Sequence, residues 1–234
     1  MRSRCINILA ILFFFLSFSS VAYSGEYEDG LEAYYRGEYA VAVKKFRKSA
    51  EQGDASAQGM LGLMYYYGYG VPQDYKEAAK WYLKAAEQGN AYDAQYMLGG
   101  MYATGEGVPE DHKEAAKWYL KAAEQGNIYA QGMLGLMYLN GEGVPQDYKE
   151  AVKWYRKAAE QGDRFAQSEL GAMYGNGKGV PQDYVLAYMW FNLSSYNGNQ
   201  TAAENRDKVL KLMTPGQIEK AQTLTREWLE KKGK

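Results

Sequence analysis

A single residue pattern recurs four times along this chain of 234 residues, and it constrains the fold more than any other feature. The string Val-Pro-Gln/Glu-Asp starts at positions 71, 108, 144 and 180, which are 37, 36 and 36 residues apart. A Leu-Gly pair, a Met-Tyr pair and a tryptophan recur in the same frame. Self-similarity at this period is typical of proteins in which one small unit stacks on the next copy of itself. The chain is therefore expected to be an array of repeated units.

Two helices are predicted in each unit, because capping signals bracket two stretches with apolar residues at helical spacing. In the first copy, Asp54 is placed as an N-cap, and Gly68 can close the first helix in a left-handed conformation. Asp74 and Glu77 resemble a capping box, which would open a second helix that ends at Gly89. The pattern predicts helix-turn-helix units and an all-α fold.

One such hairpin cannot bury both of its apolar faces, whereas stacked copies form a continuous core. The expected fold is therefore an α-solenoid of four repeats with capping helices at both ends. Its last helix, at about residues 215 to 231, should cover the end of the stack. We expect these segments: a signal peptide over 1–24, an N-terminal capping hairpin over 25–53, repeats over 54–90, 91–127, 128–163 and 164–199, and C-terminal capping helices over 200–234.

Glycine stands in the middle of every predicted first helix, at Gly62, Gly99, Gly135 and Gly171. A glycine inside a helix costs about 1 kcal/mol relative to alanine, so four copies of it indicate a use. Close approach of a neighbouring helix is the expected use, with alanine pairs such as Ala85 and Ala86 in the second helices making room.

The first 24 residues differ from the rest of the chain. Arg2 and Arg4 precede an apolar stretch from Ile6 to Phe18, which is shorter than the roughly 20 residues that span a bilayer, and small residues follow it. This pattern predicts a secretory signal peptide, export to the periplasm or the cell exterior, and no membrane attachment after cleavage. Cys5 is the only cysteine and lies in this segment, so the mature chain is expected to have no thiol.

The rest of the sequence offers no chemistry typical of an enzyme. The formal net charge of -1 does not suggest a nucleic-acid partner. His112 is the only histidine and occupies a slot that holds tyrosine in the other repeats, and no second histidine or mature-chain cysteine exists to complete a site, so a metal or catalytic role is not expected for it. The Gly-x-Gly strings follow helices rather than strands, which argues against a phosphate-binding loop. We predict no cofactor, no metal site and no catalytic residue.

A family resemblance becomes specific at the level of the whole unit. The string Ala-Gln-x-x-Leu-Gly-x-Met-Tyr-x-x-Gly-x-Gly-Val-Pro-Gln-Asp-Tyr, followed by Ala-x-x-Trp-Tyr-x-Lys-Ala-Ala-Glu-Gln-Gly, resembles the Sel-one-like repeat, a relative of the tetratricopeptide repeat. The likeness covers residues 54–198. It implies a right-handed superhelix of paired helices. It also implies roles in assembling protein complexes, in envelope or signalling pathways, or at a host interface.

The positions that face away from the predicted core of the first helices carry no charge, which is unusual for an exposed helix face. In superhelical arrays of this type, that side lines the concave groove. Neutral, aromatic surface is typical of the centre of a protein interface, although the same residues could simply complete the packing between units. Asn140 and Asn176 are the polar groups best placed to hold a peptide backbone. The predicted binding residues, called the strip below, are Leu63, Tyr66, Tyr67, Tyr96, Thr104, Leu136, Leu139, Asn140 and Asn176.

These observations favour a non-catalytic scaffold in the bacterial envelope that binds a protein or a peptide. One alternative is a secreted factor that engages host proteins through the same surface. Another is a hydrolase of cell-wall or β-lactam substrates, an activity that the resemblance associates with cysteine-rich relatives. This chain lacks their cysteines and shows no nucleophile beside a base.

Overall fold

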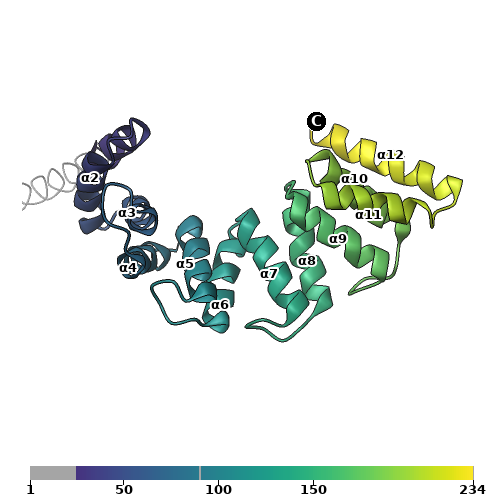
Figure 1. Cartoon of the computed structure of the whole chain (residues 1–234), viewed down its shortest axis with the longest axis horizontal. Coiled ribbons are helices and arrows are strands. Elements are labelled where there is room, and N and C mark those ends of the chain that lie inside the picture. Colours follow the sequence, from purple (N-terminus) through teal and green to yellow (C-terminus); the bar gives the residue numbers. More distant parts are fainter. Residues whose placement is uncertain (1–24, 90, 234) are drawn as a thin grey trace, which may run out of the picture. The chain divides into compact units, whose positions relative to one another are not determined.

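The computed structural model describes residues 25–89 and 91–233, and within them the chain is helical throughout and contains no strand (Figure 1). The predicted signal peptide lies outside the described residues. A helical segment over residues 25–35 comes first. It is followed by α2 (Tyr39–Glu51), α3 (Ala55–Tyr67), α4 (Tyr75–Ala86), α5 (Tyr92–Thr104), α6 (His112–Glu124), α7 (Ile128–Asn140), α8 (Tyr148–Glu160), α9 (Arg164–Asn176), α10 (Tyr184–Tyr196), α11 (Gln200–Leu210) and α12 (Pro215–Lys231). The expected all-helical repeat fold is confirmed.

The chain divides into two compact units between Glu110 and Asp111. In the first unit, α2 packs on α3, α3 on α4 and α4 on α5. Phe46, Leu61 and Met64 are among its fully buried side chains, so the N-terminal hairpin and the first repeat share one core. The predicted capping hairpin is therefore built like a repeat.

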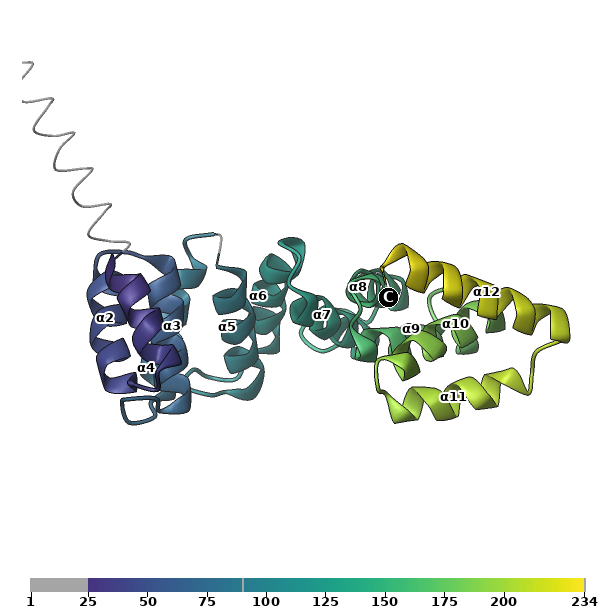
Figure 2. The same cartoon turned by 90° about the horizontal axis from the view of Figure 1, so that it is seen from above.

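The second unit runs from α6 to α12, and successive helices from α6 to α10 pack on one another. Helix α10 is apolar on nearly all sides because α9, α11 and α12 all contact it. Figure 2 shows α11 and α12 on either side of α10. The last helix begins at the predicted residue, with Thr214 and Gln217 forming a reciprocal capping box. Its Trp228 ring meets the Trp190 ring edge-on at 6.4 Å, so α12 covers the end of the stack as expected.

The predicted helix boundaries follow from local capping. The Asp54 and Asp74 side chains accept hydrogen bonds from the first-turn backbone amides of α3 and α4. Gly68 ends α3 with a φ of 73°, in the left-handed region that glycine adopts most easily. The predicted capping box at Asp74 and Glu77 is wrong in one respect, because Glu77 forms an ion pair with Lys80 on the next turn rather than reaching back to the N-cap.

At Gly62, Gly135 and Gly171, an aromatic ring of the paired second helix lies where a side chain would be. A Cβ atom added to Gly135 would lie 2.6 Å from the Tyr155 ring. Corresponding rings lie at 2.8 Å for Gly62, 2.9 Å for Gly171 and 2.7 Å for Gly30 in the capping hairpin. Since these distances are below any ordinary carbon contact, the ring position and the glycine depend on each other.

A buried glutamine near the start of each first helix joins neighbouring hairpins. The Gln131 side-chain amide donates to the Ala123 carbonyl at 3.1 Å, and its oxygen accepts from Gln161 at 2.8 Å. It therefore links the end of the preceding second helix to the end of the second helix of its own repeat. Gln58 and Gln167 make the same pair of bonds in their repeats.

Candidate protein-binding surface

All nine residues of the strip lie on first helices, and none of them is buried. Five belong to the unit that ends at Glu110 and four to the unit that follows it. Tyr67 is 52% exposed and Leu136 is 37% exposed. Thr104, Asn140 and Asn176 are also exposed, whereas Leu63, Tyr66, Tyr96 and Leu139 are half-buried.

The aliphatic strip residues serve packing as well as presenting surface. Leu63 packs against the core of the first unit and Leu139 against the core of the second. Tyr67 and Leu136, in contrast, leave a large part of an apolar side chain in solvent. Packing therefore accounts for Leu63 and Leu139, whereas it does not account for the exposed parts of Tyr67 and Leu136.

The polar strip residues already use part of their hydrogen-bonding capacity. The Asn176 side-chain amide donates to the Ala172 carbonyl at 2.9 Å, and the Asn140 amide donates to the Glu142 carboxylate at 3.0 Å. Thr104 donates back to the Gly100 carbonyl at 3.1 Å. Each asparagine keeps a second N–H donor and a carbonyl acceptor, so a peptide group can still be bound at both positions.

The strip positions themselves carry no charge, but two carboxylates from outside the strip lie beside them. Glu106 and Glu142 come from the loops that follow α5 and α7, and they lie against strip residues. The Tyr66 hydroxyl donates to the Glu106 carboxylate at 2.7 Å. Burial, and after it the Glu106 carboxylate, raises the pKa of Tyr66 far above its ordinary value, so this hydroxyl stays a donor.

A third acidic group, Glu169 on α9, was also missed. It occupies the helix position that holds Met60, Met97 and Met133 in the other repeats. The protein atoms around it raise the pKa of the Glu169 carboxyl, although the side chain is exposed. The sequence signal was available, because this is the one repeat in which a charge replaces methionine.

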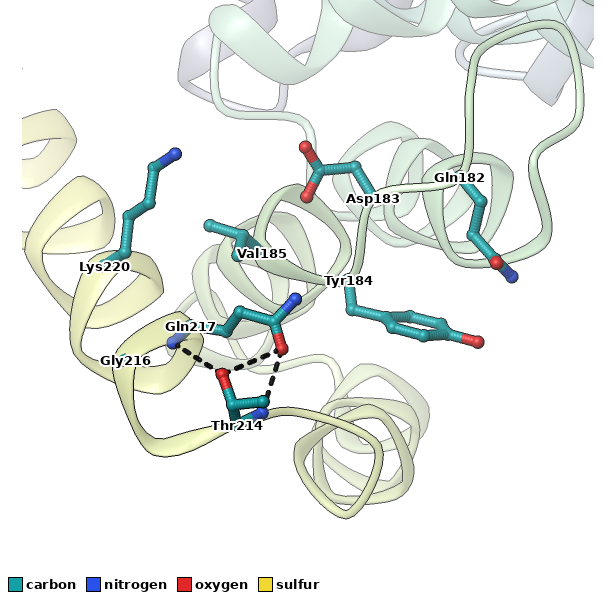
Figure 3. A pocket seen from close by; sticks show the side chains of 8 residues that line it. All are labelled: Gln182, Asp183, Tyr184, Val185, Thr214, Gly216, Gln217 and Lys220. Carbon is teal, nitrogen blue, oxygen red and sulfur yellow. Dashed lines mark hydrogen bonds between the residues drawn. The ribbon is translucent and has the colours of Figure 1, made fainter.

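A polar hollow of about 540 Å³ lies in the second unit, where the loop before α10 faces the start of α12 (Figure 3). Its carboxylate, Asp183, accepts from the Leu186 backbone amide and so caps α10. Its Thr214 and Gln217 side chains bond to each other and cap α12. Asp183, Thr214 and Gln217 are thus engaged at helix starts, and Gln182 donates to the Gly175 carbonyl near the end of α9. These groups do not form a nucleophile with a base.

Two kinds of feature are absent from residues 25–89 and 91–233. No three His, Cys, Asp or Glu side chains converge there to hold a metal ion. No helix within these ranges is both long enough and apolar enough to span a bilayer.

Comparison with known proteins places the repeats in a family. Residues 55–90, 93–127, 128–163 and 164–199 each match the Sel1 repeat. The chain is similar to a Sel1 repeat protein from Oxalobacter formigenes, with 32% identity over 84% of both chains and a TM-score of 0.72. No curated protein matches the sequence.

Two other solved structures are also similar. One is a protective antigen present in uropathogenic Escherichia coli strains that displays an SLR fold. It has 32% identity and a TM-score of 0.51, and the match covers 89% of this chain and 61% of that one. A Sel1 repeat protein from Klebsiella pneumoniae shares the fold, with 24% identity over 80% of this chain and 92% of that one, and a TM-score of 0.50.

Proposed function

Because the chain belongs to the Sel1 repeat family, we propose that it is a non-catalytic scaffold that binds a protein or a peptide through the strip. The main support for the proposal is the difference between the exposed faces of the first and second helices. First helices expose Tyr67 and Leu136 beside asparagine and threonine, whereas the exposed positions of the second helices carry lysine and glutamate. Charge-poor surface with exposed apolar groups is what the centre of a protein interface requires.

The contacts of the strip support an extended segment as its ligand. Asn140 and Asn176 each retain one donor and one acceptor, which is the complement of a peptide group. Glu142 adds a carboxylate acceptor beside Asn140 in the second unit, and Glu106 adds one beside Tyr66 in the first unit. In each unit, a partner that brings backbone amides or basic side chains would therefore find acceptors.

Export is a second part of the proposal. The segment 1–24 has the charge and the apolar length of a signal peptide, so the working location is the periplasm. The E. coli relative, described as a protective antigen, favours a second candidate, a secreted factor that engages host proteins. Recovery of the native protein from culture supernatant rather than from the periplasmic fraction would support the secreted factor over the periplasmic scaffold.

The binding role can be tested by crosslinking in cells, followed by purification and mass spectrometry. The strip variant is Leu136→Asp with Asn176→Asp, since both side chains are exposed and neither substitution should unfold the chain. The matched control is Leu212→Asp with Gln222→Asp, which places the same charges on exposed positions away from the strip. We expect crosslinked partners to be lost from the strip variant and kept by the control. Partners retained by both variants would refute the proposed surface.

A further inference from the structure

Seven tyrosines in the first unit form one connected group, called the tyrosine cluster. Tyr69 is at its centre. The Tyr39 ring stacks on the Tyr69 ring, with centroids 4.9 Å apart and planes at 15°. The Tyr67 ring also stacks on the Tyr69 ring, with centroids 5.6 Å apart and planes at 22°. Further ring contacts bring in the other members, which are Tyr34, Tyr35, Tyr66 and Tyr75.

The fold explains how rings from two hairpins meet here. Gly70 has a φ of 71° and packs directly against the backbone carbonyl of Tyr39, where any side chain would overlap it. This contact places the adjacent loop residue, Tyr69, beside the start of α2. Tyr67 ends α3 in the same turn, so three rings from two hairpins are brought into one stack.

Repeat packing does not require three of these rings, those of Tyr66, Tyr67 and Tyr69. The slot of Tyr67 holds Thr104, Asn140 and Asn176 in the later repeats. The slot of Tyr69 holds Glu106, Glu142 and Lys178, and the slot of Tyr66 holds Ala103, Leu139 and Gly175. Tyr35 is 81% exposed, so the cluster leaves aromatic surface in water that a ligand could cover.

The cluster also presents hydrogen-bond donors. Across the described residues, no protein group bonds to the hydroxyls of Tyr34, Tyr35, Tyr39, Tyr67 or Tyr69. Burial, followed by the neighbouring Tyr39 and Tyr69 hydroxyls, raises the pKa of Tyr34, which is consistent with hydroxyl groups that lie near one another. The surface therefore combines aromatic rings with several donors.

The rings and donors of the cluster suit some kinds of ligand better than others. The Tyr69 ring is stacked against two other rings, those of Tyr39 and Tyr67, whereas a sugar stacks on an open ring face. The described chain has no sheet edge to which a strand could be added, and an amphipathic helix needs an aliphatic groove rather than tyrosines. A polyproline II segment fits better, because prolines pack among aromatic side chains and its carbonyls have no internal partner.

Charge narrows the class of ligand further. Glu106 lies at the edge of the cluster on Tyr66 and pairs with no cation of the described chain. On another side, one cation, Arg36, is shared by Glu32 and Glu38. This excess of carboxylates is complementary to a basic residue.

We infer that the tyrosine cluster binds a proline-rich peptide segment that carries an arginine or lysine beside its prolines. The inference rests on the proposed function, since it names the kind of partner that the scaffold would hold, and it assigns that partner to the first unit.

The test uses protein purified after expression of the full chain and a fluorescein-labelled peptide of ten prolines and two arginines, with binding measured by fluorescence anisotropy. The cluster variant is Tyr35→Ala with Tyr67→Ala, and the matched control is Tyr129→Ala with Tyr196→Ala, which are similarly exposed tyrosines in the second unit. Removing two interface tyrosines should weaken binding by about tenfold or more, and the control should bind like the unaltered protein. Circular dichroism verifies that both variants are folded.

Three further measurements separate the contributions of the tyrosine hydroxyls, the prolines and the arginines. Tyr35→Phe with Tyr67→Phe keeps the rings and removes two donors, so we expect a loss of about two- to fivefold. A peptide in which glycine and serine replace the prolines should not bind, and replacement of its arginines by glutamates should weaken binding.

Equal binding of the glycine-serine peptide, or an unchanged affinity of the cluster variant, would overturn the inference. So would binding of a chitin hexasaccharide that the cluster variant loses while the proline peptide does not bind, because the cluster would then be a carbohydrate site. The proposed function is tested separately, on strip residues of the second unit. If crosslinked partners depend on Leu136 and Asn176 while the peptide fails to bind, only the present inference is wrong.

Discussion

At the scale of single residues, glycines do two different things in the first helices. Gly135 lies under the Tyr155 ring, so the absence of a side chain is a packing requirement. Gly132, one turn earlier in the same helix, has open space within 4 Å of the point where a Cβ atom would lie. Both are glycines in a helix interior, and only the tertiary contact separates them.

The two glycines should therefore respond in opposite directions to alanine. Gly135→Ala places a carbon 2.6 Å from an aromatic ring and should lower the free energy of unfolding by about 1 to 3 kcal/mol. Gly132→Ala should raise it by about 0.5 to 1 kcal/mol, because alanine is the better helix former. Urea titrations monitored by circular dichroism measure both. A Gly135→Ala chain as stable as the unaltered one would show that the ring moves aside at little cost.

At the scale of elements, a loop glycine aligns each hairpin with the one before it. Gly143 has a φ of 69° and lies against the His112 carbonyl at the start of α6. Gly179 makes the same contact with Tyr148 at the start of α8. The loop between two helices of one repeat is therefore packed on the previous repeat.

Substitution of Gly143 tests this contact, with Gly126 as its control. Gly126 also has a positive φ, 94°, but no atom lies within 4 Å of the point where its Cβ would be. Gly126→Ala should lower the free energy of unfolding by about 1 to 2 kcal/mol, from the strained backbone conformation alone. Gly143→Ala should lower it clearly more, and with it the Tm, because the added carbon also overlaps the His112 backbone. If the two variants melt at the same temperature, the loop contact does not stabilise the array.

At the scale of the whole molecule, a repeat array needs protected ends, because each inner hairpin has two apolar faces. Helix α12 supplies this protection in the second unit by covering α10, and Ala221 is fully buried between them. The capping hairpin continues the same core in the first unit, through Phe46. Neither end depends on a disulfide, since the sequence has one cysteine.

Loss of the C-terminal cap should cause self-association. Ala221→Asp buries an unpaired charge against α10, which costs several kcal/mol unless α12 detaches and exposes an apolar helix. Light scattering is expected to show larger species, and an apolar dye should bind to the exposed surface. Gln222→Asp adds the same charge on an exposed neighbour and should stay like the unaltered protein. A monomeric Ala221→Asp variant would mean that α12 is not needed to cover α10.

Local signals in the sequence determined the helices and their order. Asp54, Asp74 and Gly68 act on backbone groups a few residues away, so the boundaries that they predict need no knowledge of the rest of the chain. The repeat itself then identified the family and the solenoid. Position on a helix predicted that the strip faces away from the core of its own helix, and it left open whether the strip completes the packing or binds a partner.

Only the tertiary structure decided what lies beside these residues. Glu106 meets Tyr66 across 40 positions, Gln161 meets Gln131 across 30, and the tyrosine cluster joins rings from segments on either side of α2. Helical spacing describes one element at a time, and it contains no information on which loop is packed against which helix. The sequence could therefore predict a neutral strip, while the carboxylates and the aromatic stack next to it depend on how the hairpins pack.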